Sequence, residues 1–235
     1  MSETLLPNQG RSEVVEYDGK RYSRLPIKTH IVTQNDTMKD LVKTYALPHI
    51  QSGDILFISE KIVACTQGRA IPLSSVKVSK LAQRLSKYVS QEYSEGLGNV
   101  ESMQMAIEEA GRLRIILSAA FGGFGKLLGQ KGWFYLLAGE RVRGIDGPAM
   151  RSIPPYDESI VLIPLNTHQV CRELSAVLGG AVVAIVDANH IGCNLLGISH
   201  KEYKKEFFSA VLKDNPLGQS REQTPLGIIR EKNKA

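Results

Sequence analysis

The sequence contains few of the residues that mark several common classes of protein. Cysteine occurs three times in 235 residues and never in CxxC spacing, which excludes a disulfide framework and a zinc ribbon. We therefore predict that Cys65, Cys171 and Cys193 are buried free thiols. No apolar run approaches the roughly 20 residues that a membrane-spanning helix needs. The N-terminal segment is also too polar for a signal peptide, so we expect a cytoplasmic protein that does not span a membrane.

Aromatic residues and concentrated positive charge are also scarce. Aromatics make up 6% of the chain, and the formal net charge of +5 comes from basic residues interleaved with acids. A nucleic-acid surface is typically built from a basic stripe or from aromatic platforms. The charge is better explained by a solvated surface together with an anion-binding cleft, which argues against a nucleic-acid partner.

Two aspartates each follow an apolar segment, Asp146 after YLLAGERVRGI and Asp187 after AVVAIV. A strand that ends in a carboxylate presents an anionic oxygen at the rim of a buried sheet, where open α/β sheets bind ligands. The pair therefore suggests a divalent metal site. The alternative is local chemistry, in which Asp146 forms a turn with Gly147 and Pro148, and Asp187 caps a turn with Asn189.

Patterns of strands and helices alternate along the chain and predict a mixed α/β (α+β) fold with parallel and antiparallel strands. Residues 29–54 predict a strand, a cap at Asn35 or Asp36 and a helix stopped by Pro48. Further helices are expected at 78–93, 101–109, 168–179 and 199–212, the last capped by Ser199.

Glycine-rich stretches interrupt this alternation. The segment FGGFGKLLGQKG, residues 121–132, predicts a flexible loop or hairpin turn, and the glycines at 132 and 139 predict antiparallel hairpins. If the segment closed over a substrate, Lys126 and Lys131 would be the residues to test. Residues 1–20 are expected to form a disordered lead-in, and residues 231–235 a charged tail.

Five motifs recur in an order that resembles a known family. They are LPI at Leu25 to Ile27, GDILFISEKIVACTQGR at Gly53 to Arg69, GIDGPAM, SIVLIPLNTHQVCREL and AVVAIVDANHIG. Their order and spacing resemble the gamma-glutamyl ligases of deazaflavin coenzyme F-420 biosynthesis. The resemblance covers roughly residues 21–230, which we take as one ligase-like domain.

The resemblance implies a fold, an activity and partners. It implies two subdomains that form a V and an intertwined homodimer with the nucleotide site near its interface. The implied activity is a ligase that uses GTP or ATP, with Mg²⁺ or Mn²⁺, to join L-glutamate to a small-molecule or peptide carboxylate acceptor through an acyl phosphate. Hard cations of this kind prefer oxygen ligands.

The resemblance also implies which residues form the site. The implied metal ligands are Asp146, Asp187 and Gln219, the last of which can also be a solvent-facing turn residue. The implied nucleotide-binding residues are Leu25, Pro26, Ile27, Glu60, Lys61, Gly218 and Ser220. Candidate catalytic residues are Arg69, Arg143 and Arg151, which could bind phosphates or carboxylates, with Arg141 and His190 nearby.

Three positions depart from the family pattern. Cys65 stands where the family has lysine, Ala149 where it has asparagine, and Ala188 where it has threonine. These replacements remove charge-assisted contacts typically worth about 1.5 to 3 kcal/mol each. They support an alternative hypothesis, a diverged nucleotide- or metabolite-binding protein without ligase activity.

Overall fold

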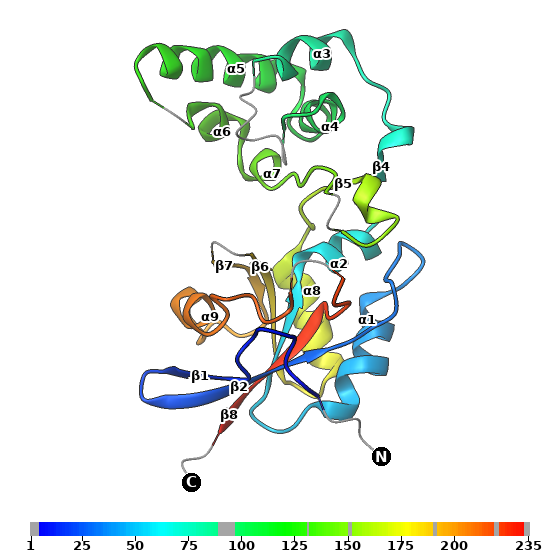
Figure 1. The fold of residues 1–235 in the computed structure, drawn as a ribbon, viewed down its shortest axis with the longest axis vertical. Helices are drawn as coiled ribbons and strands as arrows, with labels where there is room; N and C mark the ends of the chain where they lie inside the picture. Colours follow the sequence, from blue (N-terminus) through cyan, green and yellow to red (C-terminus); the bar gives the residue numbers. More distant parts are fainter. Residues whose placement is uncertain are drawn as a thin grey trace. The chain divides into compact units, whose positions relative to one another are not determined.

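The computed structural model describes residues 5–88, 97–130, 132–149, 152–189, 192–218 and 221–232. Within it the chain divides into two compact units (Figure 1). The first, here called the sheet unit, comprises Met1–Gly68 and Pro164–Ala235, and the second, the helical unit, comprises Arg69–Ile163.

A mixed six-stranded sheet is the centre of the sheet unit. Its strand order is β1-β2-β8-β3-β6-β7, and β3 and β6 are parallel while the other neighbours are antiparallel. The strands are β1 (Val14–Tyr17), β2 (Lys20–Ile27), β3 (Ile55–Ser59), β6 (Val182–Ala188), β7 (Cys193–Ile198) and β8 (Leu226–Lys232). The prediction of a mixed α/β fold with both strand directions is confirmed.

Helices cover both faces of this sheet (Figure 1). They are α1 (Met38–Leu41), a π-helix η1 (Val42–Ala46), a 3₁₀ helix η2 (Leu47–His49), α2 (Glu60–Thr66), α8 (Thr167–Val177) and α9 (Lys205–Val211). Alternate residues of β3 point to opposite faces, as strand geometry requires. Leu56 and Ile58 pack with α1 and α8, whereas Ile55 and Phe57 pack with α9.

The helical unit has a core of its own, built around Met103, Ile107, Ile115 and Ile160. Its helices are α3 (Lys80–Ser86), α4 (Val100–Ala110), α5 (Arg112–Leu127), α6 (Trp133–Ala138) and α7 (Glu140–Arg143), with 3₁₀ turns η3 (Leu73–Ser75) and η5 (Tyr156–Glu158). Its two strands, β4 (Ala70–Pro72) and β5 (Ser159–Val161), pair antiparallel.

The helices predicted at 101–109 and 168–179 are confirmed as α4 and α8. Helix α4 begins after Asn99, whose side chain accepts a hydrogen bond from the backbone N–H of Ser102. Helix α8 ends at the predicted glycines, because Gly179 adopts a positive φ and the N–H of Gly180 donates back to Ser175.

The glycine-rich segment was predicted wrongly. Residues 121–127 belong to α5, and Gly132 and Gly139 border helices rather than turning hairpins. The physical reason is packing. A Cβ at position 122 would lie 3.0 Å from the Cβ of Phe134, and one at position 125 would lie 2.8 Å from Cγ of Trp133. Glycine is needed here because α6 approaches α5 closely.

Predictions for the first 60 residues also need correction. Residues 14–17, expected in a disordered lead-in, form β1. The strand expected after residue 29 lies earlier in the chain, where Lys20–Ile27 form β2. Thr37, not Asn35 or Asp36, caps α1 by accepting from the N–H of Asp40 at 3.2 Å. The carboxylate of Asp36 instead accepts from the backbone N–H of Thr33 at 2.7 Å, which closes the preceding turn.

Two further boundaries differ from expectation near the C-terminus. Lys204, and not Ser199, precedes α9, because Ser199 exchanges hydrogen bonds with Val183 and so extends the pairing of β7 with β6. The expected charged tail begins inside β8, which runs to Lys232.

Candidate functional site

Asp187 lies where β6, the strand between β3 and the edge strand β7, leaves the core of the sheet unit. Residues 183–186 of this strand are completely buried, whereas Asp187 and Ala188 are half-buried. The carboxylate therefore lies at the edge of a buried sheet, as the apolar run before it predicts.

Three predicted site residues meet at this edge. Strands β3 and β6 are parallel, with Ser59 opposite Val186. Glu60 and Lys61, the first residues of α2, therefore leave the sheet on the same side as Asp187. Lys61 is thus the second residue of α2, two positions after the end of β3.

The segment between α9 and β8 reaches the same edge. The backbone N–H of Ser59 donates to the carbonyl oxygen of Pro225 at 2.9 Å. Earlier in this segment Gly218 has a φ of +81°, and its carbonyl oxygen accepts from the Asn215 side chain at 2.7 Å. Gln219 and Ser220, the predicted metal ligand and nucleotide contact, lie outside the described residues.

Sequence reasoning missed one carboxylate in this segment. Glu222 lies against Gly218, since a Cβ at position 218 would lie 2.5 Å from its Cδ. The available signal was its place in a glycine-containing loop three residues before Pro225, whereas Gln219 lies six residues before the same proline. Glu222 therefore becomes a candidate oxygen donor beside the predicted loop residues.

A tight turn follows Asp187. The N–H of Asn189 donates to the carbonyl oxygen of Gly192 at 2.9 Å, and the N–H of Gly192 donates to the Asn189 side chain at 3.2 Å. The Asn189 amide also reaches the carboxylate of Asp187 at 3.5 Å, a long and weak hydrogen bond. His190, the candidate next to this turn, lies outside the described residues.

Two cysteines of the sheet unit, Cys171 and Cys193, are unsuited to metal binding or nucleophilic chemistry. Burial, reinforced by the charge of Asp187, raises the pKa of Cys193 to about 12. Burial raises the pKa of Cys171 to about 12 as well. Both remain neutral thiols near pH 7, and only the thiolate is a good ligand or nucleophile. Cys65 is also buried and lies outside any disulfide, so the prediction of three buried cysteines without a disulfide is confirmed.

Asp146 belongs to the helical unit and is held by its backbone. Its N–H donates to the carbonyl of Val161, and its own carbonyl accepts from the Val161 N–H, both at 2.9 Å. This isolated bridge follows α7, so the strand predicted before Asp146 is wrong. The half-buried side chain of Asp146 nevertheless extends from a backbone that these two hydrogen bonds hold in place.

The two described arginines of the predicted catalytic set differ in their surroundings. Arg69 is mostly buried, pairs with Glu109 at 2.8 Å and donates through Nε to the carbonyl oxygen of Ile163 at 2.7 Å. Arg143 is 64% exposed and contacts Glu140 at 3.4 Å, a surface pair of little energetic weight. Arg151 lies outside the described residues.

The LPI motif is part of the sheet unit's core. Leu25, Pro26 and Ile27 end β2 and pair with Ile228, Gly227 and Leu226 of β8. Ile27 is buried and Leu25 packs against the same apolar cluster, so these two side chains stabilise the sheet. Pro26 is buried as well, so Leu25 is the one residue of the motif with a partly exposed side chain.

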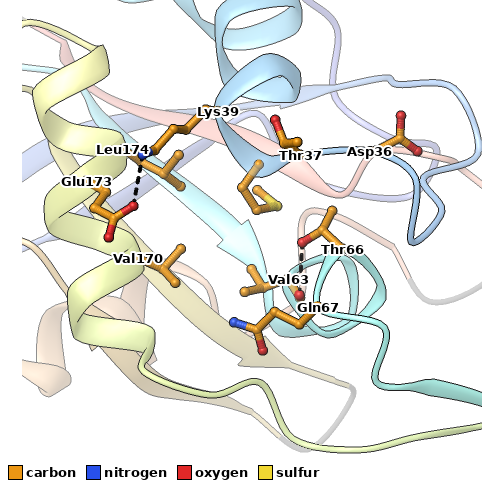
Figure 2. Close-up of a pocket in the computed structure, with 10 residues that line it drawn as sticks. Asp36, Thr37, Lys39, Val63, Thr66, Gln67, Val170, Glu173 and Leu174 are labelled. Atoms are coloured by element: carbon orange, nitrogen blue, oxygen red, sulfur yellow. Dashed lines mark hydrogen bonds and ion pairs between the residues drawn. The ribbon is translucent and has the colours of Figure 1, made fainter.

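A pocket of about 230 Å³ lies between α1, α2 and α8 (Figure 2). Its wall is apolar at Met38, Val63, Val170 and Leu174, and its rim includes Lys39 paired with Glu173 at 3.1 Å. Ligand pockets typically enclose roughly 300 to 1,000 Å³, so this one is too small for a nucleotide. None of the predicted site residues lines it.

Two further features are absent from the described ranges. No three histidine, cysteine, aspartate or glutamate side chains there form a cluster able to hold a metal ion. Among the same residues, no helix has both the length and the apolar character needed to cross a membrane.

Comparison with known proteins assigns a family. No curated protein matches the chain. The sequence model described as F420-0:gamma-glutamyl ligase matches residues 26–190, which include Asp146, Asp187 and the segment from Glu60 to Arg69. The match spans well over half of the 235 residues and agrees with the motif order. The chain therefore belongs to the F420-0:gamma-glutamyl ligase family, a family of ligases.

Proposed function

We propose that this protein is a nucleotide-dependent ligase that forms an amide bond between L-glutamate and a carboxylate acceptor. Membership of the ligase family supports the reaction class. The observation that carries the proposal is the shared sheet edge at which Glu60, Lys61 and Asp187 emerge from the parallel strands β3 and β6. Open α/β sheets use this kind of edge for ligands.

The residues present fit a hard divalent cation such as Mg²⁺ or Mn²⁺. Asp146 and Asp187 are half-buried carboxylates, and Asp187 is followed by an amide side chain directed at it. The nearest described thiol with a resolved pKa, Cys193, stays protonated, so oxygen is the available donor type. Gln219 and Glu222 are further proposed oxygen donors. When bound, such an ion neutralises charge on a transferring phosphoryl group.

The proposed reaction has two steps. An oxygen of the acceptor carboxylate attacks the terminal phosphorus of GTP or ATP, which releases the nucleoside diphosphate and forms an acyl phosphate. The amine of L-glutamate then attacks the acyl carbon, inorganic phosphate leaves, and the amine loses a proton. The protein's task in the first step is mainly to position the groups and stabilise charge.

The basic residues take different proposed roles. The ammonium of Lys61, at the sheet edge, binds phosphate as a point charge. Glu60, Gly218 and Ser220 make the other proposed contacts to the nucleotide. The exposed guanidinium of Arg143 binds a carboxylate of glutamate or acceptor in a bidentate manner. Arg69 is proposed as a positioning residue, because its guanidinium is already bound by the carboxylate of Glu109 and the carbonyl oxygen of Ile163.

A second candidate function is nucleotide or metabolite binding without ligation. The engagement of Arg69 by Glu109 favours it, since a guanidinium held in an ion pair has fewer donors for a substrate. Cys65 points the same way, because it is buried in α2 where the family has a charged residue.

Calorimetric titration of GTP and ATP in the presence of Mn²⁺ or Mg²⁺ tests the binding step. We expect metal-dependent nucleotide binding by the unchanged protein and at least a ten-fold weaker affinity for Asp187→Asn and for Asp146→Asn. Glu202→Gln and Glu158→Gln, exposed acids in the two units, are the matched controls and should bind normally. Absence of metal-dependent binding in the unchanged protein would overturn the proposal.

Glutamate-dependent release of nucleoside diphosphate separates the two candidate functions. The assay mixes the nucleotide that binds, L-glutamate and a panel of carboxylate acceptors, and follows phosphate by ³¹P NMR. A ligase should release phosphate only when glutamate and a suitable acceptor are both present. Binding without turnover across a panel that includes deazaflavin acceptors would instead support the binding protein.

A further inference from the structure

The N-terminal segment, residues 5–12, runs along the sheet unit before β1 begins (Figure 1). At its start, Leu5 packs against the apolar cluster that covers one face of the sheet. At its end, the buried guanidinium of Arg24 donates a hydrogen bond to the carbonyl oxygen of Ser12. Both ends of this segment are therefore attached to the sheet.

Between these two anchors, the half-buried Asn8 contacts the loop that connects α9 to β8. We call the described residues of this loop, 215–218 and 221–224, the loop segment. The side-chain amide of Asn8 donates to the carbonyl oxygen of Pro216 at 2.9 Å and to the hydroxyl oxygen of Thr224 at 2.8 Å. One amide thus uses both of its N–H bonds to join the two ends of the loop segment.

Three successive carbonyl oxygens of the loop segment each accept a hydrogen bond from a side chain. The pairs are Asn8 with Pro216 at 2.9 Å, Thr224 with Leu217 at 2.8 Å and Asn215 with Gly218 at 2.7 Å. A carbonyl oxygen directed at a phosphate repels it, whereas backbone N–H groups attract it. Because these three oxygens are directed at side-chain donors, they are kept away from an anion bound beside the loop segment.

Asn8 is the donor in this network that comes from outside the loop segment. Its partners Pro216 and Thr224 are buried, so their hydrogen bonds to Asn8 are shielded from water. A buried acceptor that loses its donor bears the cost of its desolvation, and the backbone then moves to satisfy it elsewhere. Loss of the Asn8 amide should therefore change the conformation of the loop segment.

The loop segment carries residues that belong to the proposed nucleotide site. Gly218 is a proposed nucleotide contact, and Glu222, a proposed oxygen donor, lies against it. The chain continues to Pro225, whose carbonyl oxygen accepts from the N–H of Ser59 at the sheet edge. Binding groups work only when supporting hydrogen bonds hold them in the productive geometry. The position of Gly218 at the sheet edge thus depends on contacts at both ends of the loop segment.

We propose that Asn8 is a positioning residue for the nucleotide: its amide holds the loop segment in the conformation that presents Gly218 to the phosphates. This inference rests on the proposed function, because the nucleotide is the ligand proposed for that site. Asn8 and the loop segment both lie outside residues 26–190, which match the family model. A loop that is ordered before binding does not have to be ordered by the ligand, and affinity is higher for that reason.

Asn8→Asp is the sharpest variant, because aspartate has nearly the same size and shape but no N–H to donate. Amide hydrogen exchange, followed by mass spectrometry, should become about ten-fold faster in the loop segment and stay unchanged in β3. Calorimetric titration with GTP or ATP and Mg²⁺ should give an affinity about five-fold weaker. Gln9→Glu, the same chemical change at the exposed neighbouring residue, is the matched control and should alter neither measurement.

Variants of Thr224 repeat the test without adding a charge. Thr224→Val removes the hydroxyl group that accepts from Asn8, so it should accelerate exchange in the loop segment and weaken nucleotide binding as Asn8→Asp does. Thr224→Ser keeps the hydroxyl group and should bind nucleotide nearly as well as the unchanged protein. The combined Asn8→Asp, Thr224→Val protein should be little worse than either single variant, because the two residues act through one contact.

The two measurements separate the possible failures. Unchanged exchange in Asn8→Asp would overturn the inference, whether or not the protein binds nucleotide. Faster exchange with unchanged affinity would also overturn it, since Asn8 would then stabilise the loop segment without serving the ligand. Failure of the unchanged protein to bind GTP or ATP is a different result. It would remove the proposed function and the role of Asn8 with it, even if exchange showed that Asn8 holds the loop segment.

Discussion

The residue with the strongest local constraints in the sheet unit is Arg24. Its side chain on β2 is completely buried, and its guanidinium pairs with both carboxylate oxygens of Asp214. It also donates to the backbone carbonyls of Val211, at 3.1 Å, and Ser12. A buried charge is tolerated only when it is paired in this way. Arg24 therefore ties β2 to the end of α9 and to the N-terminal segment.

This pair predicts a loss of stability in acid. Burial alone would raise the pKa of Asp214, but hydrogen bonding and the charge of Arg24 outweigh it and hold that pKa below its ordinary value of 3.8. A lowered folded-state pKa contributes stability above the unfolded value, which is lost as pH falls through the folded-state pKa. We expect the free energy of unfolding, measured in urea, to fall below about pH 4.

Asp214→Asn should weaken this pH dependence and Asp214→Ala should lower the free energy of unfolding at pH 7 by about 3 kcal/mol, because Arg24 is left buried without its charge partner. Glu202→Gln, at an exposed carboxylate, serves as the control. An unchanged urea midpoint for Asp214→Ala at pH 7 would show that the Arg24 pair contributes little.

At this scale the sequence predicted where Asp187 lies in the fold but not the surroundings of other candidate residues. Asp187 could be predicted because the apolar run before it is continuous and ends at the strand's end. The state of Arg69 could not, because its partner Glu109 is distant in sequence and reaches it only through the fold. Glu222 has a different reason: its place before Pro225 was visible in the sequence, but its contact with Gly218, four residues earlier, depends on how the loop folds back.

Among the elements, α5 and α6 show how tertiary packing overrides local preference. Glycine is costly in a helix interior and predicts a turn. In α5 two glycines face α6 and are required by the close approach of Phe134 and Trp133. The helices α4 and α8 were predicted correctly because the Asn99 cap of α4, the glycines that end α8 and the apolar spacing of each helix lie within one segment. Residues 121–127 are helical because they pack against α6, and this contact cannot be inferred from their own segment of sequence.

Two glycines of α5 make a matched pair of substitutions. Gly125→Ala should destabilise the protein by about 1 to 3 kcal/mol, because its Cβ would lie 2.8 Å from Trp133 and force a shift. Gly123→Ala should stabilise it by about 0.5 to 1 kcal/mol, since its Cβ meets nothing within 4 Å and alanine favours helix. Urea unfolding of both variants and of the unchanged protein, at one protein concentration, measures the two effects. Equal effects of the two substitutions would contradict the packing explanation.

On the scale of the whole molecule, the sheet unit is made from the two ends of the chain. Strand β2 near the N-terminus pairs along its length with β8 near the C-terminus, for example Arg24 opposite Ile229. Alternating strand and helix patterns predicted the fold class, yet such patterns carry no information on which distant strands pair. For that reason the order β1-β2-β8-β3-β6-β7 could not be predicted.

The chain leaves the sheet unit after Gly68 and returns at Pro164, and hydrogen bonds join the two segments next to these positions. The Gln67 side chain donates to the carbonyl oxygen of Leu165 at 2.9 Å and accepts from its N–H at 2.8 Å, so the chain leaves and returns side by side. A short linker can therefore replace the helical unit, because closing a small loop between neighbouring ends costs little entropy.

We predict that a chain in which Gly-Gly-Ser-Gly replaces residues 69–163 folds into the sheet unit alone. Its core does not need the helical unit, because the apolar clusters on both sheet faces consist of sheet-unit residues. Cooperative thermal unfolding by circular dichroism and dispersed amide signals in an NMR spectrum would support this. A second shortened chain that also carries Gln67→Ala should be less stable than the first, since it loses both hydrogen bonds to Leu165. A molten or aggregated product from the first chain would mean that the sheet unit depends on the helical unit to fold.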